Sequence, residues 1–165
     1  MAFLPFDKFD LLTSLTPDEI LERLALNVNT DQRVNWFTND SNNDYLYEGR
    51  ISSQKFDIKR VINYRNSFNP QIKGTISTEK SGCRIQIVMS LHPAVLVFMC
   101  MWMGGLLIGG ISIMVSQIIE QKFQPASLFI IAMFLFGYVL TTGGYKYESN
   151  DSIRFLNEMF EAQEI

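Results

Sequence analysis

Few residues in this chain are of a type and in a position to do chemistry. The 165 residues include one histidine, His92, and two cysteines, Cys83 and Cys100. A cysteine nucleophile needs a base such as histidine within hydrogen-bond reach. Cys100 lies in a long apolar run and Cys83 in a predicted strand, so neither suits such a pair. We predict no catalytic residue and no enzyme activity, and two unpaired thiols are typical of a reducing compartment.

Metal and cofactor motifs are also missing from the sequence. It has no CxxC, HExxH, Walker loop, GxGxxG or GxSxG pattern, so we predict no metal and no cofactor. His92 precedes an apolar run, which leaves two interpretations open. It is either a polar cap at a membrane surface or an imidazole that binds a headgroup phosphate or senses pH.

The most distinctive polar stretch is KRVINYRNSFNPQIKG, residues 59–74. Its basic and hydrogen-bonding side chains suit an acidic protein partner or an anionic lipid surface. The other interpretation is a strand–loop–strand connection with a solvated basic face. The basic residues are too dispersed to predict nucleic-acid binding. The candidate partner or lipid contacts are Arg60, Tyr64, Arg65, Asn66, Lys73 and His92.

Two long segments contain no Asp, Glu, Lys or Arg, one between Arg84 and Glu120 and one between Lys122 and Lys146. Each exceeds the roughly 20 apolar residues that cross a hydrocarbon core of about 30 Å. We predict transmembrane helices at about 93–119 and 125–142. The link between them is too short for a domain, so they form a helical hairpin over residues 93–144.

Charges beside the hairpin predict its orientation. The link offers Lys122 alone, whereas the other side offers Lys80, Arg84, Lys146 and Arg154. By the positive-inside rule, the soluble part and both termini are cytoplasmic, in a multi-pass protein of the plasma (inner) membrane.

Small residues recur at three- and four-residue steps in both spans. Such residues allow close approach of helices in membranes. They predict contact within the hairpin, with a dimer seam as the alternative. The candidate helix-packing residues are Gly105, Gly109, Ser112, Ser116, Gly137, Thr141 and Gly144.

The soluble residues predict a small α+β domain, residues 1–92, that is completed by a C-terminal helix in 145–165. Thr16, Pro17 and Glu19 form a capping box before an amphipathic helix. From residue 45 the apolar period becomes two and predicts an antiparallel meander of about four strands, with one face covered. The predicted strands are 45–51, 55–64, 70–78 and 83–92.

The C-terminal helix has an apolar stripe at Ile153, Leu156, Met159 and Phe160, with Asn150 as a candidate cap. The nearest surface that can bury this stripe is the sheet made before the hairpin. The dipeptide His92–Pro93 suits a direct strand-to-helix joint, since the residue before proline favours extended geometry and proline suits a first helical turn. The hairpin is therefore predicted to be an insertion into one domain.

The stretches YRNSFNPQIKGTI and MSLHPAVLVFMCMW resemble a family of small bacterial membrane proteins of uncharacterised function. The resemblance covers roughly residues 45–105. It implies a strand that ends in Leu-His-Pro and enters a two-helix hairpin, and a bacterial inner-membrane location, but no catalytic residue. The matching positions are Arg65, Asn66, Ser67, Phe68, Pro70, Ile72, Gly74, Leu91, His92, Pro93, Phe98 and Trp102.

These features together predict a non-enzymatic membrane-anchored interaction protein. Its cytosolic domain would bind an unknown protein partner or the anionic lipid surface. The alternative is a homo-oligomeric membrane scaffold or pore that assembles through the glycine-rich helix faces. Neither span carries a charged residue, which disfavours a proton relay or ion pathway.

Overall fold

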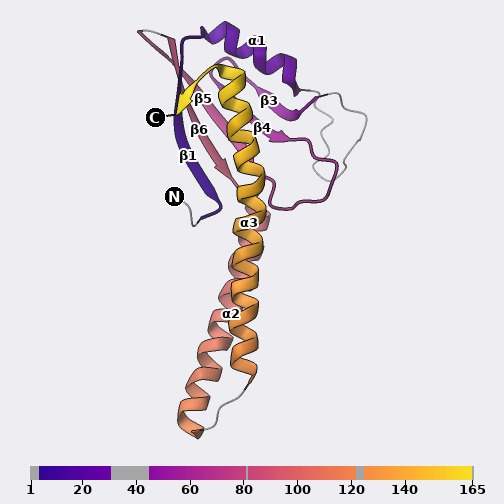
Figure 1. Cartoon of the computed structure of the whole chain (residues 1–165), viewed down its shortest axis with the longest axis vertical. Helices are drawn as coiled ribbons and strands as arrows, with labels where there is room; N and C mark the ends of the chain where they lie inside the picture. The colour runs from indigo at the N-terminus through magenta and orange to yellow at the C-terminus, as the bar shows by residue number, and fades with distance from the viewer. Residues whose placement is uncertain (1–3, 31–44, 81, 122–124, 165) are drawn as a thin grey trace.

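The computed structural model describes residues 4–30, 45–80, 82–121 and 125–164, which form an α+β domain with a projecting two-helix hairpin (Figure 1). Residues 31–44, which include an asparagine-rich connection, and Lys122 lie outside the described residues. The elements in chain order are β1 (Phe6–Thr13), α1 (Pro17–Asn27), β2 (Val28–Asn29), β3 (Tyr47–Ile51), β4 (Lys55–Arg60), β5 (Gln71–Glu79), β6 (Gly82–Ser90), α2 (Pro93–Glu120), α3 (Ala126–Phe160) and β7 (Gln163–Glu164).

Within the described residues, the strands form one seven-stranded sheet in the order β2-β3-β4-β5-β6-β1-β7. Strands β3 to β6 are the antiparallel meander that the sequence predicts. The sheet is larger than the predicted four strands, and it is mixed because β2 pairs parallel to β3. Strands β2 and β7 have two residues each, which is too short for any periodic pattern in the sequence.

Strand β1 is the main addition to the predicted sheet. It pairs antiparallel with β6 along its whole length, from Phe6 opposite Ser90 to Thr13 opposite Cys83. Its buried residues Phe9, Leu11 and Thr13 alternate with more exposed ones. The period-two signal is therefore present in the N-terminal segment, but it covers only half of the strand.

The core lies between the sheet and two helices, α1 and the C-terminal half of α3 (Figure 1). Cys83 is buried in it and is not in a disulfide. Gly74 lets the ring of Phe56 lie across the neighbouring strand, since a Cβ at Gly74 would lie 2.0 Å from that ring. The fully or almost fully buried apolar residues include Leu11, Ile20, Leu24, Ile58, Ile72, Ile85, Ile87, Met89, Tyr145, Leu156 and Phe160.

Helix α1 begins as the sequence predicts. The Thr16 side chain accepts a hydrogen bond from the Glu19 N–H, and the Glu19 carboxylate accepts one from the Thr16 N–H. Both bonds satisfy backbone N–H groups that have no partner within the helix at its start. Pro17 occupies a position in the first turn where no N–H is needed. Ile20 and Leu24 are buried in the core, so this helix covers part of the sheet.

Strand β6 ends two residues before the predicted His92, and only Leu91 and His92 connect it to α2, which confirms a short strand-to-helix joint. His92 caps the helix, because its Nδ1 accepts a hydrogen bond from the Ala94 N–H at 3.2 Å, and Pro93 occupies the first turn. The preceding Leu91 is buried in the domain. This arrangement fixes the direction in which α2 leaves the sheet.

Helix α3 differs from the prediction of a span followed by a separate C-terminal helix. It runs without interruption from Ala126 to Phe160. The expected cap at Asn150 is absent because Asn150 lies inside this helix. Two adjacent glycines, Gly143 and Gly144, disfavour a helix by about 1 kcal/mol each, which tertiary contacts can outweigh. The predicted stripe is confirmed, since Leu156 and Phe160 are buried and its other two residues pack on the core.

Both hairpin helices are long and apolar enough to cross a membrane. Only 6% of the most apolar 18-residue window of α2, and 17% of that of α3, is buried inside the structure. A core helix of a soluble protein would be mostly buried. Helix α2, with 28 residues, is about 42 Å long and extends past the start of α3 (Figure 1).

Candidate functional site

A buried carboxylate on α3 organises the connection between β4 and β5. Glu148 is 0% exposed. Its Oε1 accepts hydrogen bonds from the Tyr64 hydroxyl and, at 3.1 Å, from Asn66 Nδ2. Its Oε2 lies 3.2 Å from Arg60 Nη1. A buried charge is tolerated when it is paired and hydrogen-bonded in this way.

Further bonds keep the connection in this conformation. Arg60 Nη1 also lies 3.0 Å from Asp151 Oδ2, one turn further along α3. Asn69 Nδ2 donates to the Arg60 carbonyl at 2.9 Å, and the Phe68 N–H donates to Asn66 Oδ1 at 3.0 Å. The hydrogen bond that Tyr64 donates to Glu148 raises the pKa of its phenol to about 12. The connection is therefore attached to α3 by directional polar contacts.

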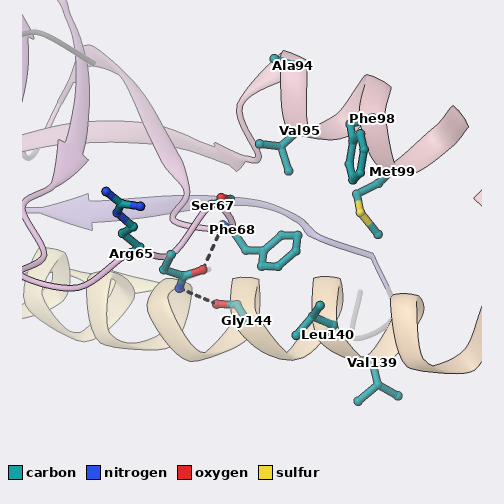
Figure 2. A pocket seen from close by; sticks show the side chains of 11 residues that line it. Arg65, Ser67, Phe68, Ala94, Val95, Phe98, Met99, Val139, Leu140 and Gly144 are labelled. Atoms are coloured by element: carbon teal, nitrogen blue, oxygen red, sulfur yellow. Dashed lines mark hydrogen bonds between the residues drawn. The ribbon is translucent and has the colours of Figure 1, made fainter. Parts of the chain in front are cut away.

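Below this cluster, a groove of about 750 Å³ lies where the domain meets the hairpin (Figure 2). Its walls come from three parts of the chain that are distant in sequence: the β4–β5 connection, the first turns of α2 and the middle of α3. The lining residues are Arg65, Asn66, Ser67, Phe68, Ala94, Val95, Phe98, Met99, Val139, Leu140 and Gly144.

Phe68 sets the shape of the groove near the domain. Its ring lies between α2 and α3 in Figure 2. A Cβ at Gly144 would come within 2.9 Å of that ring, so the glycine allows the aromatic side chain to rest on the helix backbone. Asn66 adds a weak bond, because its Nδ2 lies 3.5 Å from the Gly144 carbonyl. The stretch RNSF is therefore a structural wall of the groove.

Arg65 is the one charged residue in the lining. It is exposed, and it forms no ion pair with any residue that the structure describes. In Figure 2 its side chain lies at the domain end of the groove, away from the apolar side chains of α2. Glu148 lies about one helical turn from Gly144 on α3, but it does not line the groove. Its carboxylate is fully buried and is paired with Arg60.

The six candidate contact residues therefore separate into different roles. Three of them, Arg60, Tyr64 and Asn66, bind Glu148, although Tyr64 remains 51% exposed. Arg65 lies at the groove. The remaining two are elsewhere: Lys73 is on β5 within 3.9 Å of Asp57 Oδ2, and His92 caps α2.

The candidate helix-packing residues also lie in different surroundings. In α3, Gly137 lies against Trp102 and Met99 of α2, whereas Gly144 lies against Phe68. Thr141 is buried and donates to the Gly137 carbonyl at 2.7 Å.

The α2 candidates lie mainly outside the contact between the helices. A Cβ at Gly105 or Gly109 meets nothing within 4 Å, while one at Gly110 would meet Ile130 at 3.3 Å. The Ser112 and Ser116 hydroxyls bond to their own helix, at the Ile108 carbonyl and Glu120 Oε1.

Sequence reasoning missed Glu148, although a signal for it exists. Residues 148, 152, 156 and 160 share one face of α3, and the last two belong to the predicted apolar stripe. A carboxylate on a buried stripe needs a partner, and residues 59–74 offer cations and amides. The groove itself had no local signal, because its three walls meet only in the folded chain.

No cluster of three or more His, Cys, Asp or Glu side chains that could hold a metal occurs in the described part of the chain. The arrangement suits recognition of an amphiphile, with apolar walls and one cation, and offers no nucleophile–base pair among these lining residues. Comparisons with protein-family models, with curated proteins and with solved structures found no match.

Proposed function

We propose that this chain is a non-enzymatic membrane-anchored interaction protein whose α+β domain is held at the bilayer surface and recognises anionic lipid there. The observation that carries this proposal is the position of the groove. It opens where the two apolar helices leave the domain, with Arg65 at its domain end. A cation at a membrane surface attracts anionic lipid by about 1 kcal/mol.

Two features support a domain that is fixed close to the bilayer. Only two residues separate β6 from α2, and α3 is continuous from the hairpin into the core. In addition, Tyr145 of α3 donates a hydrogen bond to the Met89 carbonyl of β6 at 3.0 Å. A protein partner at residues 60–66 is less well supported, because Glu148 already engages Arg60, Tyr64 and Asn66.

The proposed location is the bacterial inner membrane with both termini in the cytoplasm. The resemblance of residues 45–105 to small bacterial membrane proteins supports this location, and the charge bias supports the orientation. Single-cysteine variants test it, with Lys80→Cys on the domain and Gln121→Cys at the far end of the hairpin. A membrane-impermeant maleimide should label Gln121→Cys in intact spheroplasts and Lys80→Cys only after lysis. The reverse pattern would invert the orientation.

Hydrogen exchange in lipid nanodiscs tests the function. The full-length protein is compared in phosphatidylcholine alone and in a mixture with phosphatidylglycerol. We expect amides of residues 61–70 to exchange more slowly in the anionic mixture. Arg65→Glu should remove the difference, while Arg154→Glu, an exposed arginine on α3, should preserve it. Identical exchange of residues 61–70 in both lipid compositions would contradict recognition of anionic lipid.

The second candidate function is a homo-oligomeric membrane scaffold or pore. One observation favours it: Gly105 and Gly109 lie on α2 with open space around them, so this face is not used inside the hairpin. Close packing on such residues drives helix association in membranes. Replacing both with leucine should abolish self-crosslinks in membranes. A wild-type protein that gives no self-crosslink excludes this candidate.

A further inference from the structure

We propose that the groove holds one anionic glycerophospholipid, with its phosphate at Arg65 and one acyl chain between α2 and α3. This inference rests on the proposed function and names the ligand and its position. It depends on four observations. The groove has apolar walls, a single charge in its lining, an opening at the side through which a lipid can enter, and a wall that internal contacts hold in place.

The walls match an acyl chain. Phe98, Met99 and Leu140 present hydrocarbon and sulfur surface along the groove, and no acidic side chain is in the lining. The volume of about 750 Å³ lies within the range of about 300–1,000 Å³ for sites that bind small molecules. A lipid tail in a bilayer is already in apolar surroundings, so burial of the tail gives little selectivity. Selection must therefore come from the headgroup.

The charge at the domain end selects a phosphate. Arg65 is exposed and has no described ion-pair partner. Its planar guanidinium forms bidentate bonds with phosphate oxygens. The start of α2 also lines the groove, at Ala94, and the first turn of that helix contains no acidic residue. The positive end of the helix dipole therefore adds to the attraction for an anion.

The groove is open towards the apolar outer surfaces of the helices. Phe98 is 61% exposed and Leu140 is 48% exposed, and both also line the groove. A lipid can therefore enter sideways without leaving the bilayer. A free phosphate ion would use Arg65 but not these walls, so a phospholipid accounts for both parts of the site.

The hydrogen bonds to Glu148 help to hold one wall of the groove in place. Asn66 binds Glu148 and the Phe68 N–H, and the Phe68 ring rests on Gly144. These contacts hold the wall at the domain end and keep it from collapsing into the groove. The site is consequently formed before the lipid arrives, which lowers the entropy cost of binding.

Native mass spectrometry of the full-length protein tests this inference. The protein is extracted in mild detergent from vesicles of equal parts phosphatidylcholine and phosphatidylglycerol. We expect one retained lipid for each chain, with phosphatidylglycerol enriched. Arg65→Gln should reduce the enrichment about fivefold, and Arg154→Gln should leave it unchanged.

Two leucines of α3 provide a matched pair. Leu140 lines the groove, whereas Leu135 is outside the lining and has a similar exposure of 55%. Leu140→Trp should fill the groove and remove most of the retained lipid, while Leu135→Trp should retain it. If Leu140→Trp lowers the melting temperature, Ala94→Trp fills the groove from α2 instead.

The outcomes separate this inference from the function on which it rests. Equal lipid retention by Leu140→Trp, Ala94→Trp and wild type would overturn the groove site. Retention of both lipids by wild type in vesicle proportions would overturn the selection of an anion. If either occurs while nanodisc exchange still depends on phosphatidylglycerol, the proposed function stands and the groove is excluded. Co-purification of a stoichiometric protein in place of lipid would also overturn the site.

Discussion

The two halves of α3 are one continuous helix in two different environments. In the first half, Leu135, Phe136 and Val139 are exposed by 55–64%. In the second half, Leu156 and Phe160 are completely buried in the core of the domain. The backbone is helical throughout, so the difference comes from side chains and from what surrounds them. The exposed apolar side chains of the hairpin half favour apolar surroundings, whereas those of the domain half are covered by the core.

The two halves of α3 also differ in whether they contain charged residues. The hairpin half contains no acidic or basic residue, while the domain half places Glu148 at 0% exposure and compensates it with Arg60. The bilayer and the domain core both exclude unpaired charge, but only the domain brings a cation from another segment to pair it. We therefore expect substitutions in the two halves of α3 to differ in their effects on stability and on membrane insertion.

The largest expected effect is on the buried ion pair. Arg60→Leu leaves the Glu148 carboxylate buried without its cation, which should lower the free energy of unfolding by about 3–5 kcal/mol. Asp151→Asn removes a partner that is 42% exposed, and should cost about 0–1 kcal/mol. Chemical unfolding in detergent, followed by circular dichroism, measures both. The double variant Arg60→Leu/Glu148→Leu should recover much of the loss, and equal costs for both single variants would contradict this account.

A lysine on each half of α3 compares their environments directly. Phe136 and Tyr147 are 62% and 68% exposed. Phe136→Lys should oppose membrane insertion by about 3 kcal/mol, because a charged side chain then faces the hydrocarbon. Tyr147→Lys should have almost no effect on insertion. Glycosylation mapping of the hairpin gives the inserted fraction, and unchanged insertion of Phe136→Lys would argue against a membrane environment for this half.

The two adjacent glycines mark the boundary between the halves. An added Cβ meets nothing within 4 Å at Gly143 but comes within 2.9 Å of Phe68 at Gly144. Gly143→Ala should stabilise the helix by about 0.5–1 kcal/mol. Gly144→Ala should destabilise the protein by about 1–3 kcal/mol, because Phe68 must move. Thermal unfolding in detergent ranks the pair, and stabilisation by both variants would show that Phe68 does not need the glycine.

The smallest effect concerns Tyr64 at high pH. The pKa of its phenol rises from an ordinary value of 10 to about 12 in the folded state, through the hydrogen bond to Glu148. The protonated phenol therefore contributes stability below pH 10, and this contribution is lost as the pH rises towards 12. The free energy of unfolding, measured across this pH range, should fall more steeply for wild type than for Tyr64→Phe. Parallel curves would contradict the contribution of this hydrogen bond.

The sequence predicts elements well where the signal is local. The capping box at Thr16, the strands of the meander and the His92–Pro93 joint all depend on residues within a few positions of one another. The prediction is weaker where tertiary contacts decide. Strand β1 pairs with residues of β6 that are 70 to 84 positions away, and α3 continues through Gly143 and Gly144. For the candidate site, the sequence singles out Arg60, Tyr64 and Asn66, but the reasoning from it missed Glu148, which binds all three.

By itself, the sequence determines which segments are apolar, which faces they present and where chain direction changes, since burial leaves a period of two or 3.6 in the residue pattern. Only the tertiary structure decides that Glu148 meets Arg60, Tyr64 and Asn66, each more than 80 positions away. Only the fold brings Arg65, Phe98 and Leu140 to one groove. Periodicity records that a face must be covered, and it does not record which distant side chains cover it.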